Sequence, residues 1–337
     1  MTIRDVAKRA GVSIATVSRV LNGSERVSEQ AKLSVISAME ALNYQKPPAK
    51  RKKPTKLFAV IVRNMSNPFF TQLVDVLEEE AYKHGRSILL FNSRNNLQLE
   101  KTFLSECINH KVDGVFLIPR SLKKEHLEPL GELPFPVVLL TATDPTVASI
   151  GTHHQHGGEQ VACYFAKRGY RRIGFIGASD IQSDRFIGFQ TELKSRDILL
   201  DKKHVLAPYT TESLTEYIQH LIVDNSSPLE AVFCSDDISA SHLFNGLKSV
   251  DSQLLERVDI VGFDDTFIAQ SLGFSSVKQP IHQIALLGFD MMMELIQIGE
   301  SFPKAMLLEP TVVIRHTPKV PSISRSPEIL RNNVQQR

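Results

Sequence analysis

At 337 residues, 42% of them hydrophobic and 23% charged, the chain has a globular composition and enough length for two or three domains. Its net charge of +2 hides an asymmetry, because residues 1–56 hold 12 Lys/Arg and 4 Asp/Glu, whereas the remainder holds 27 Lys/Arg and 33 Asp/Glu. A basic N-terminal segment, suited to phosphate binding, therefore precedes an acidic remainder. Three scattered cysteines, no apolar run approaching a membrane span and no signal-peptide pattern argue against a disulfide framework, a membrane partner and export, and favour a cytoplasmic protein.

Residues 2–44 show the spacing of three short helices joined by two turns. In the first helix Ile3, Val6 and Ala7 share one face, with Thr2 at the N-cap position. Gly11 then tolerates a positive φ, and Ser13 can cap a second helix from residue 14 to about residue 21.

A third helix begins after a Ser28 cap, and its apolar residues are Leu33, Ile36, Met39 and Leu42. A helix, a glycine-containing turn and a second helix that exposes Arg19 form the helix-turn-helix arrangement, whose second helix enters the DNA major groove. The alternative is an ordinary small helical bundle.

Residues 45–56 indicate a linker, because three prolines forbid a continuous helix and six Lys/Arg repel one another while attracting phosphates. From Leu57 the pattern alternates between strand and helix. We expect strands at 57–62, 87–91, 114–118, 136–140, 172–177, 231–234 and 258–263, and helices at 69–84, 97–110, after Gly158, at 184–196 and at 238–249. This alternation implies parallel sheets with helices on both faces, and because the series restarts at Arg171 we expect two doubly wound subdomains. The Ser/Pro/Asn/Gln-rich tail 318–337 lacks leucine heptads, which predicts disorder and no coiled coil.

Polar residues follow four of the expected strands. Ligands of open α/β sheets bind beyond the carboxyl ends of the strands, and facing subdomains make that region a cleft. The residues at such ends are Arg63, Thr141, Asp236 and Asp264. N-capping of the helices that follow is the alternative role for the two aspartates.

Motifs of common enzymes are missing: there is no P-loop, no G-x-S-x-G elbow and no H-E-x-x-H. We therefore expect no catalysis and no cofactor. His153, His154 and His156 lack an i, i+4 spacing and a nearby cysteine, so we interpret them as a polar turn before a helix and predict no metal site.

The segment GVSIATVSRVLNG resembles the signature of the LacI/GalR (lactose-repressor) family of bacterial transcriptional regulators, and the chain to about Thr317 resembles that family's effector core. The resemblance implies an all-α helix-turn-helix headpiece plus an α/β core of two doubly wound parallel-sheet subdomains, like periplasmic binding proteins. It also implies three crossings between the subdomains. The expected parts are a headpiece (1–45), a basic hinge (46–56), an N-subdomain (57–153 and 283–312), a C-subdomain (154–282 and 313–317) and the tail (318–337).

Many members of that family place a hinge-helix leucine in the minor groove. No leucine lies between Tyr44 and Leu57. A flexible or electrostatic linker is therefore the expectation here.

By resemblance, Ile14, Ala15 and Arg19 read base edges. Arg19 can present its fork to guanine, which discriminates by about 1–3 kcal/mol. Phosphate contacts, which set register without reading sequence, are expected from Ser13, Thr16, Ser18, Asn22 and Ser28.

The resemblance also assigns effector contacts to Asp264, Arg185, Phe69, Phe70 and, more loosely, Tyr209. For Phe70 a place in the core is the alternative. Thr141 and Asp236 stand where sugar-binding members often carry Asp and Asn. Arg63, together with Arg120 and Arg185, favours an anionic effector such as a sugar acid or phosphate.

We therefore expect a homodimeric repressor of transcription that acts at the nucleoid. Its partners would be a double-stranded, pseudo-palindromic operator and a small polar metabolite, a sugar or derivative, bound between the subdomains. Control by a partner protein instead of a metabolite is the alternative.

Overall fold

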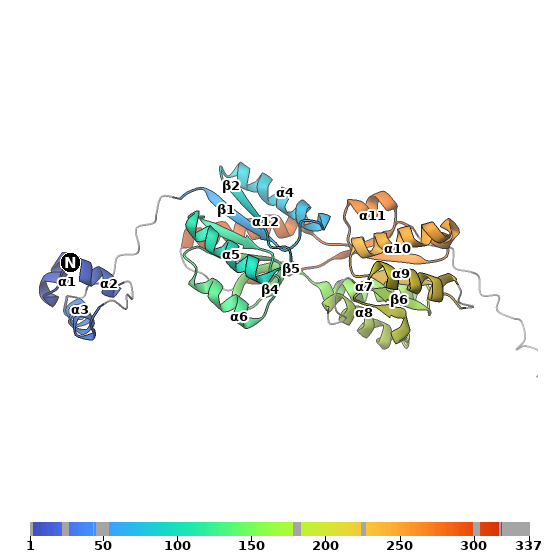
Figure 1. Cartoon of the computed structure of the whole chain (residues 1–337), viewed down its shortest axis with the longest axis horizontal. Coiled ribbons are helices and arrows are strands. Elements are labelled where there is room, and N and C mark those ends of the chain that lie inside the picture. Colours follow the sequence, from blue (N-terminus) through green and yellow to red (C-terminus); the bar gives the residue numbers. More distant parts are fainter. Residues whose placement is uncertain are drawn as a thin grey trace, which may run out of the picture. The chain divides into compact units, whose positions relative to one another are not determined.

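A computed structural model describes residues 3–21, 27–42, 44, 54–177, 183–223, 227–298, 304–316 and 318. The chain divides into two compact units, Met1–Pro54 and Thr55–Arg337, drawn in Figure 1. The predictions for Thr2, Asn22, hinge residues 46–53 and tail residues 319–337 lie outside the described residues.

The first unit is a three-helix headpiece made of α1 (Ile3–Ala10), α2 (Ile14–Leu21) and α3 (Glu29–Ala41). Its small core centres on Val6, Val17 and Val35, all fully buried. Gly11 has a φ of +63°, the left-handed turn that separates α1 from α2.

The expected apolar face of the third helix was partly wrong. In α3 the buried residues are Val35 and Ala38, whereas Leu33 and Ile36 are 66% and 47% exposed. Apolar residues occupy two faces of this helix, so periodicity alone could not select the face that packs.

The N-subdomain of the second unit contains a six-stranded sheet in the order β11-β5-β4-β3-β1-β2. Its strands are β1 (Leu57–Val62), β2 (Ser87–Asn92), β3 (Gly114–Leu117), β4 (Val137–Asp144), β5 (Val147–Thr152) and β11 (Ala305–Leu308). One apolar core lies under α4 (Pro68–Lys83) and α12 (Ile281–Ile298), and another under α5 (Leu97–Asn109) and α6 (Lys124–Leu127). Strand β5, antiparallel to β4, was not predicted.

The C-subdomain repeats this design with the order β12-β10-β9-β8-β6-β7. Its strands are β6 (Ile173–Ile176), β7 (Val205–Leu206), β8 (Ala231–Cys234), β9 (Asp259–Asp264), β10 (Ser275–Lys278) and β12 (Thr311–Val313). Helices α7 (His154–Lys167) and α8 (Asp184–Ser195) pack on one core; α9 (Thr211–Ile218), α10 (Asp237–Val250) and α11 (Phe267–Leu272) pack on the other (Figure 1).

Within the described residues the chain passes between the two sheets three times. The first crossing follows Thr152, the second lies between Lys278 and Ile281, and the third lies between Leu308 and Thr311. The expected boundaries at 282/283 and 312/313 are corrected accordingly, since they fall inside α12 and β12. Strand β12 is short and antiparallel to β10, and its pairing is not visible in sequence.

Helix α7 begins at His154 and not after Gly158, because Gly157 and Gly158 lie inside it. A Cβ at Gly158 would lie 2.0 Å from the carbonyl oxygen of Arg185, and one at Gly188 would lie 2.0 Å from that of Gln155. The two glycines therefore let α7 and α8 approach closely. This approach brings Arg185 beside the first turn of α7.

One correction concerns membrane-spanning potential. Helix α12 has 18 residues and a mean hydropathy of 1.2, which suffices by length and composition to cross a membrane. Its buried residues, among them Phe289 and Met292, belong to the N-subdomain core, so its apolar character is explained by packing against the sheet.

Candidate functional site

The headpiece presents the predicted DNA-reading residues on and around α2. Ile14 is 46% exposed and Arg19 is exposed, whereas Val17 points into the core. The helix is capped by Ser13, whose Oγ accepts the N–H of Thr16 at 3.1 Å and lies 2.9 Å from the Thr16 hydroxyl. This cap fixes the start of α2.

The structure describes the remaining predicted DNA contacts only in part. Ser28 is exposed, and its Oγ accepts the N–H of Ala31 at 3.4 Å at the start of α3. Ala15 and Ser18 lie within α2, but their side chains, like Asn22, lie outside the described residues.

In the second unit, Asp264 lies at the carboxyl end of β9, on the edge of the C-subdomain sheet where the sequence places the effector site. It ends β9, is 2% exposed and has a φ of +111°, an unusual conformation for a non-glycine residue. Its Oδ1 accepts a hydrogen bond from Gln279 Nε2 at 2.6 Å, and its Oδ2 accepts one from Asn67 Nδ2 at 3.3 Å. The capping alternative does not apply, since the residue preceding α11 is Thr266.

Arg185 supplies the positive charge beside this carboxylate. Its Nη2 lies 3.3 Å from Asp264 Oδ1, its Nη1 donates to the carbonyl of Ser235, and its guanidinium carbon lies 3.8 Å from the centre of the Phe263 ring. Burial raises the pKa of Asp264, while Arg185 opposes that rise. A buried, charge-paired carboxylate is suited to accept two hydrogen bonds from a polar ligand.

Helix α7 adds His154 to this group. Its Nδ1 lies 3.2 Å from Arg185 Nε and its Nε2 lies 3.3 Å from the carbonyl oxygen of Thr141. Burial, together with the positive charge of Arg185, lowers the pKa of His154 to about 3. Thr141 lies inside β4 and not after it, with a φ of +69° at an irregularity in the β4–β5 pairing.

The arginine cluster extends into the N-subdomain. Arg63 follows β1, and its guanidinium carbon lies 5.1 Å from the centre of the Phe70 ring. Burial lowers the pKa of Arg63, and the charge of Arg185 lowers it further. Arg120 has an exposed side chain, and its backbone N–H donates to the buried Glu100 carboxylate at 3.0 Å.

Other predicted effector residues are held by local contacts. Phe69 and Phe70 are 2% and 3% exposed and belong to the N-subdomain core. A place in the core was the alternative role given for Phe70. Asp236 caps α10 by accepting the Ser239 N–H at 2.8 Å. The Tyr209 hydroxyl lies 2.7 Å from His242 Nδ1.

Three residues that contact Asp264 or Arg185 were not among the effector contacts expected from the sequence. They are Asn67, His154 and Gln279. Asn67 caps α4 through its Oδ1 while its Nδ2 contacts Asp264, and Gln279 accepts a hydrogen bond from Thr152 at 2.6 Å while it donates to Asp264. The N-capping pattern Asn-Pro could have drawn attention to Asn67, whereas no sequence signal marks Gln279.

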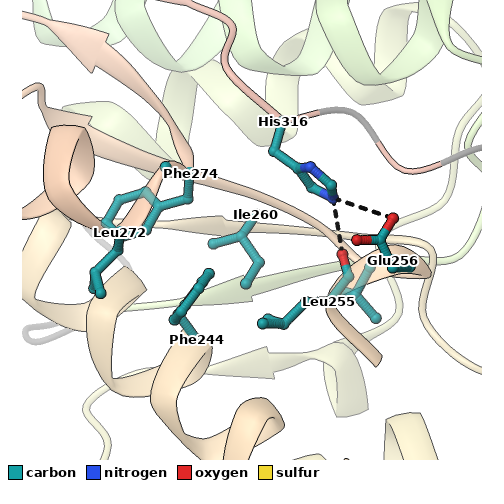
Figure 2. Close-up of a pocket in the computed structure, with 9 residues that line it drawn as sticks. Phe244, Leu255, Glu256, Ile260, Leu272, Phe274 and His316 are labelled. Atoms are coloured by element: carbon teal, nitrogen blue, oxygen red, sulfur yellow. Dashed lines mark hydrogen bonds and ion pairs between the residues drawn. The ribbon is translucent and has the colours of Figure 1, made fainter. Parts of the chain in front are cut away.

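A separate pocket of about 260 Å³ lies at the opposite edge of the C-subdomain sheet, and Figure 2 shows its lining residues. Mostly apolar residues line it, together with Glu256 and His316, and His316 Nε2 lies 3.1 Å from the carbonyl oxygen of Leu255. Val258 and Phe274 precede β9 and β10, so the pocket lies at the amino ends of these strands. It is therefore not the cleft expected at their carboxyl ends.

Comparisons with known proteins agree with this division of the chain. Residues 2–46 match the model of bacterial regulatory proteins of the lacI family, and residues 162–317 match a periplasmic binding protein-like domain. The chain is 29% identical to the transcriptional regulator RegA of Clostridium saccharobutylicum, over 94% of this chain and 96% of RegA. It is 27% identical to the regulator GalR of Escherichia coli K12, over 96% of this chain and 98% of GalR.

Among solved structures, the transcriptional regulator CelR in complex with cellobiose is similar. It matches with a TM-score of 0.65 and 25% identity, over 94% of this chain and 99% of that one. Headpiece, core topology and relatives lead to one conclusion: the chain belongs to the LacI/GalR family and is a DNA-binding transcriptional regulator, not an enzyme.

Proposed function

We propose that this protein is a homodimeric repressor that binds a pseudo-palindromic operator in the cytoplasm, at the nucleoid, and is controlled by a small polar metabolite. Ile14, Ala15 and Arg19 of α2 read base edges. The hydroxyl and amide side chains around them contact phosphates and set the register. Two headpieces of a dimer would read half-sites about one helical turn apart.

The observation that carries the effector proposal is the hydrogen-bond network of Asp264. Its carboxylate contacts Asn67 from the N-subdomain, Gln279 from the second crossing and Arg185 from the C-subdomain. A ligand hydroxyl that replaces the 3.3 Å contact with Asn67 would change what holds the subdomains together. An effector can change DNA binding only if its affinity differs between the DNA-competent and DNA-incompetent states of the protein.

The charges around Asp264 favour an anionic metabolite, such as a sugar acid or sugar phosphate. Arg185 is already paired with Asp264, whereas Arg63 has no carboxylate within 4.0 Å among the described residues. Its guanidinium is partly buried over Phe70 and could form a bidentate pair with a ligand carboxylate or phosphate.

Two experiments test the proposal. Selection of operator DNA from a random pool should return a pseudo-palindrome, and binding no tighter than to scrambled duplex would exclude a sequence-specific regulator. Calorimetric titration with matched neutral and acidic sugars should favour the acidic compound, and preference for the neutral one would exclude the anionic class. If no metabolite of a broad panel shifts the melting temperature, control by a partner protein is favoured.

A further inference from the structure

Two of the three crossings bring together a group of side chains that lies outside the effector cleft. His153 immediately precedes α7, His156 lies in its first turn, and Glu309 lies between β11 and β12. His153 Nδ1 lies 3.1 Å from Glu309 Oε1, and His156 Nδ1 contacts Glu309 Oε2. One ligand atom from each residue lies within 4.8 Å of the other two.

The donor set matches one class of cation. Two neutral imidazole nitrogens and one carboxylate suit zinc and neighbouring transition metals, which often keep three protein ligands and complete their coordination with water. Magnesium and calcium prefer sets made only of oxygen. A plain His–Glu ion pair is the competing explanation, but these side chains are 41%, 41% and 60% exposed, and exposed pairs contribute little to stability.

The surroundings hold the three residues in place. The backbone N–H of His153 donates to the carbonyl of Leu308 at 2.9 Å, which joins the first crossing to the third. Gln160 donates to the carbonyl of Pro310 at 3.1 Å and lies 3.5 Å from His156 Nε2. With Nε2 beside the Gln160 amide, Nδ1 of His156 is the nitrogen turned toward Glu309.

We infer that His153, His156 and Glu309 form a site for a divalent transition metal of the zinc class, which joins the first crossing to the third. The site does not include Asp264, Arg185 or His154, so it is independent of the proposed effector. Sequence spacing alone could not indicate it, because Glu309 lies 153 residues from His156.

The test uses the full-length chain without an affinity tag, stripped of metal with a chelator and titrated with Zn²⁺ and with Co²⁺. The wild type should bind one equivalent and melt at a temperature that rises with zinc concentration. His156→Ala and Glu309→Gln should each weaken binding at least about tenfold, the upper part of the effect known even for outer-shell partners of metal ligands. His110→Ala, which removes an exposed histidine at the end of α5, should bind as the wild type does.

The Co²⁺ complex should show d–d bands of a nitrogen- and oxygen-ligated ion, without a thiolate charge-transfer band. That band would assign the metal to a cysteine and overturn the proposal. Unchanged zinc affinity in both His156→Ala and Glu309→Gln would also overturn it. Circular dichroism and melting of each variant in the presence of chelator are compared with those of the wild type. Equal curves show that a loss of zinc binding does not come from unfolding.

Discussion

Arg185 Nε donates a hydrogen bond to His154 Nδ1 over 3.2 Å. Nδ1 must therefore be the unprotonated nitrogen, so Nε2 carries the proton and donates to the carbonyl of Thr141 at 3.3 Å. A neutral His154 thus connects β4 of the N-subdomain to the arginine that pairs with Asp264. Protonation of Nδ1 would remove its acceptor and place a second cation beside Arg185.

Because the folded-state pKa of His154 is lowered to about 3 from an ordinary value near 6.5, we predict an acid-dependent loss of stability from this residue. Between these values the unfolded chain binds more protons than the folded one, so the free energy of unfolding falls as the pH falls from about 6.5 toward 3. His154→Gln should flatten this part of a pH series of urea denaturations. His110→Gln is the matched control, and parallel profiles for wild type and His154→Gln would disprove the assignment.

Asp264→Asn should retain operator binding and lose the response to the effector. Neutralisation removes the charge from a carboxylate that we expect to accept ligand hydrogen bonds, and such charged bonds contribute about 1.5–3 kcal/mol each. Titration of the purified variant with the effector found in the panel measures the loss. Asp290→Asn, an exposed aspartate on α12, controls for charge. An unchanged response would remove Asp264 from the binding site.

The fold was largely predictable because buried parallel strands are continuous apolar runs, such as residues 57–62 and 231–234. The strands that were missed give weaker signals. Strand β7 has two residues and β11 has four, while β5 (VASIGT) and β10 (SSVK) are rich in small and polar residues. The positions of the second and third crossings depend on which sheet a short segment joins, and no local pattern records that choice.

The site was less predictable than the fold. Strand ends and family resemblance pointed to Asp264 and Arg185, which the structure pairs. Gln279 could not be found this way, because its importance comes from Thr152, which lies 127 residues earlier. Likewise, the aromatic pair Phe69 and Phe70 matched a family position, yet packing places both rings in the core.

Arg19→Ala should lose preference for the selected operator while it retains most non-specific affinity. The guanidinium fork reads a base, at about 1–3 kcal/mol, whereas non-specific binding depends on the total positive charge. Competition between operator and scrambled duplex at a fixed salt concentration measures the ratio. Arg9→Ala removes an equal charge from the exposed end of α1 and should weaken both duplexes alike. An equal loss on both duplexes for Arg19→Ala would assign it to phosphate contact.

Gly188→Ala should destabilise the C-subdomain through the contact between α7 and α8. The new Cβ would lie 2.0 Å from the carbonyl oxygen of Gln155, a backbone atom that can move only with the helix. Overpacking of this kind costs about 1–3 kcal/mol. The separation of α7 from α8 should also move Arg185 away from His154, so the acid-dependent part of the urea profile should weaken in the same variant. Gly131→Ala is the control, because its Cβ would meet nothing within 4 Å, and equal unfolding midpoints for the two variants would show that α7 and α8 do not need the glycine.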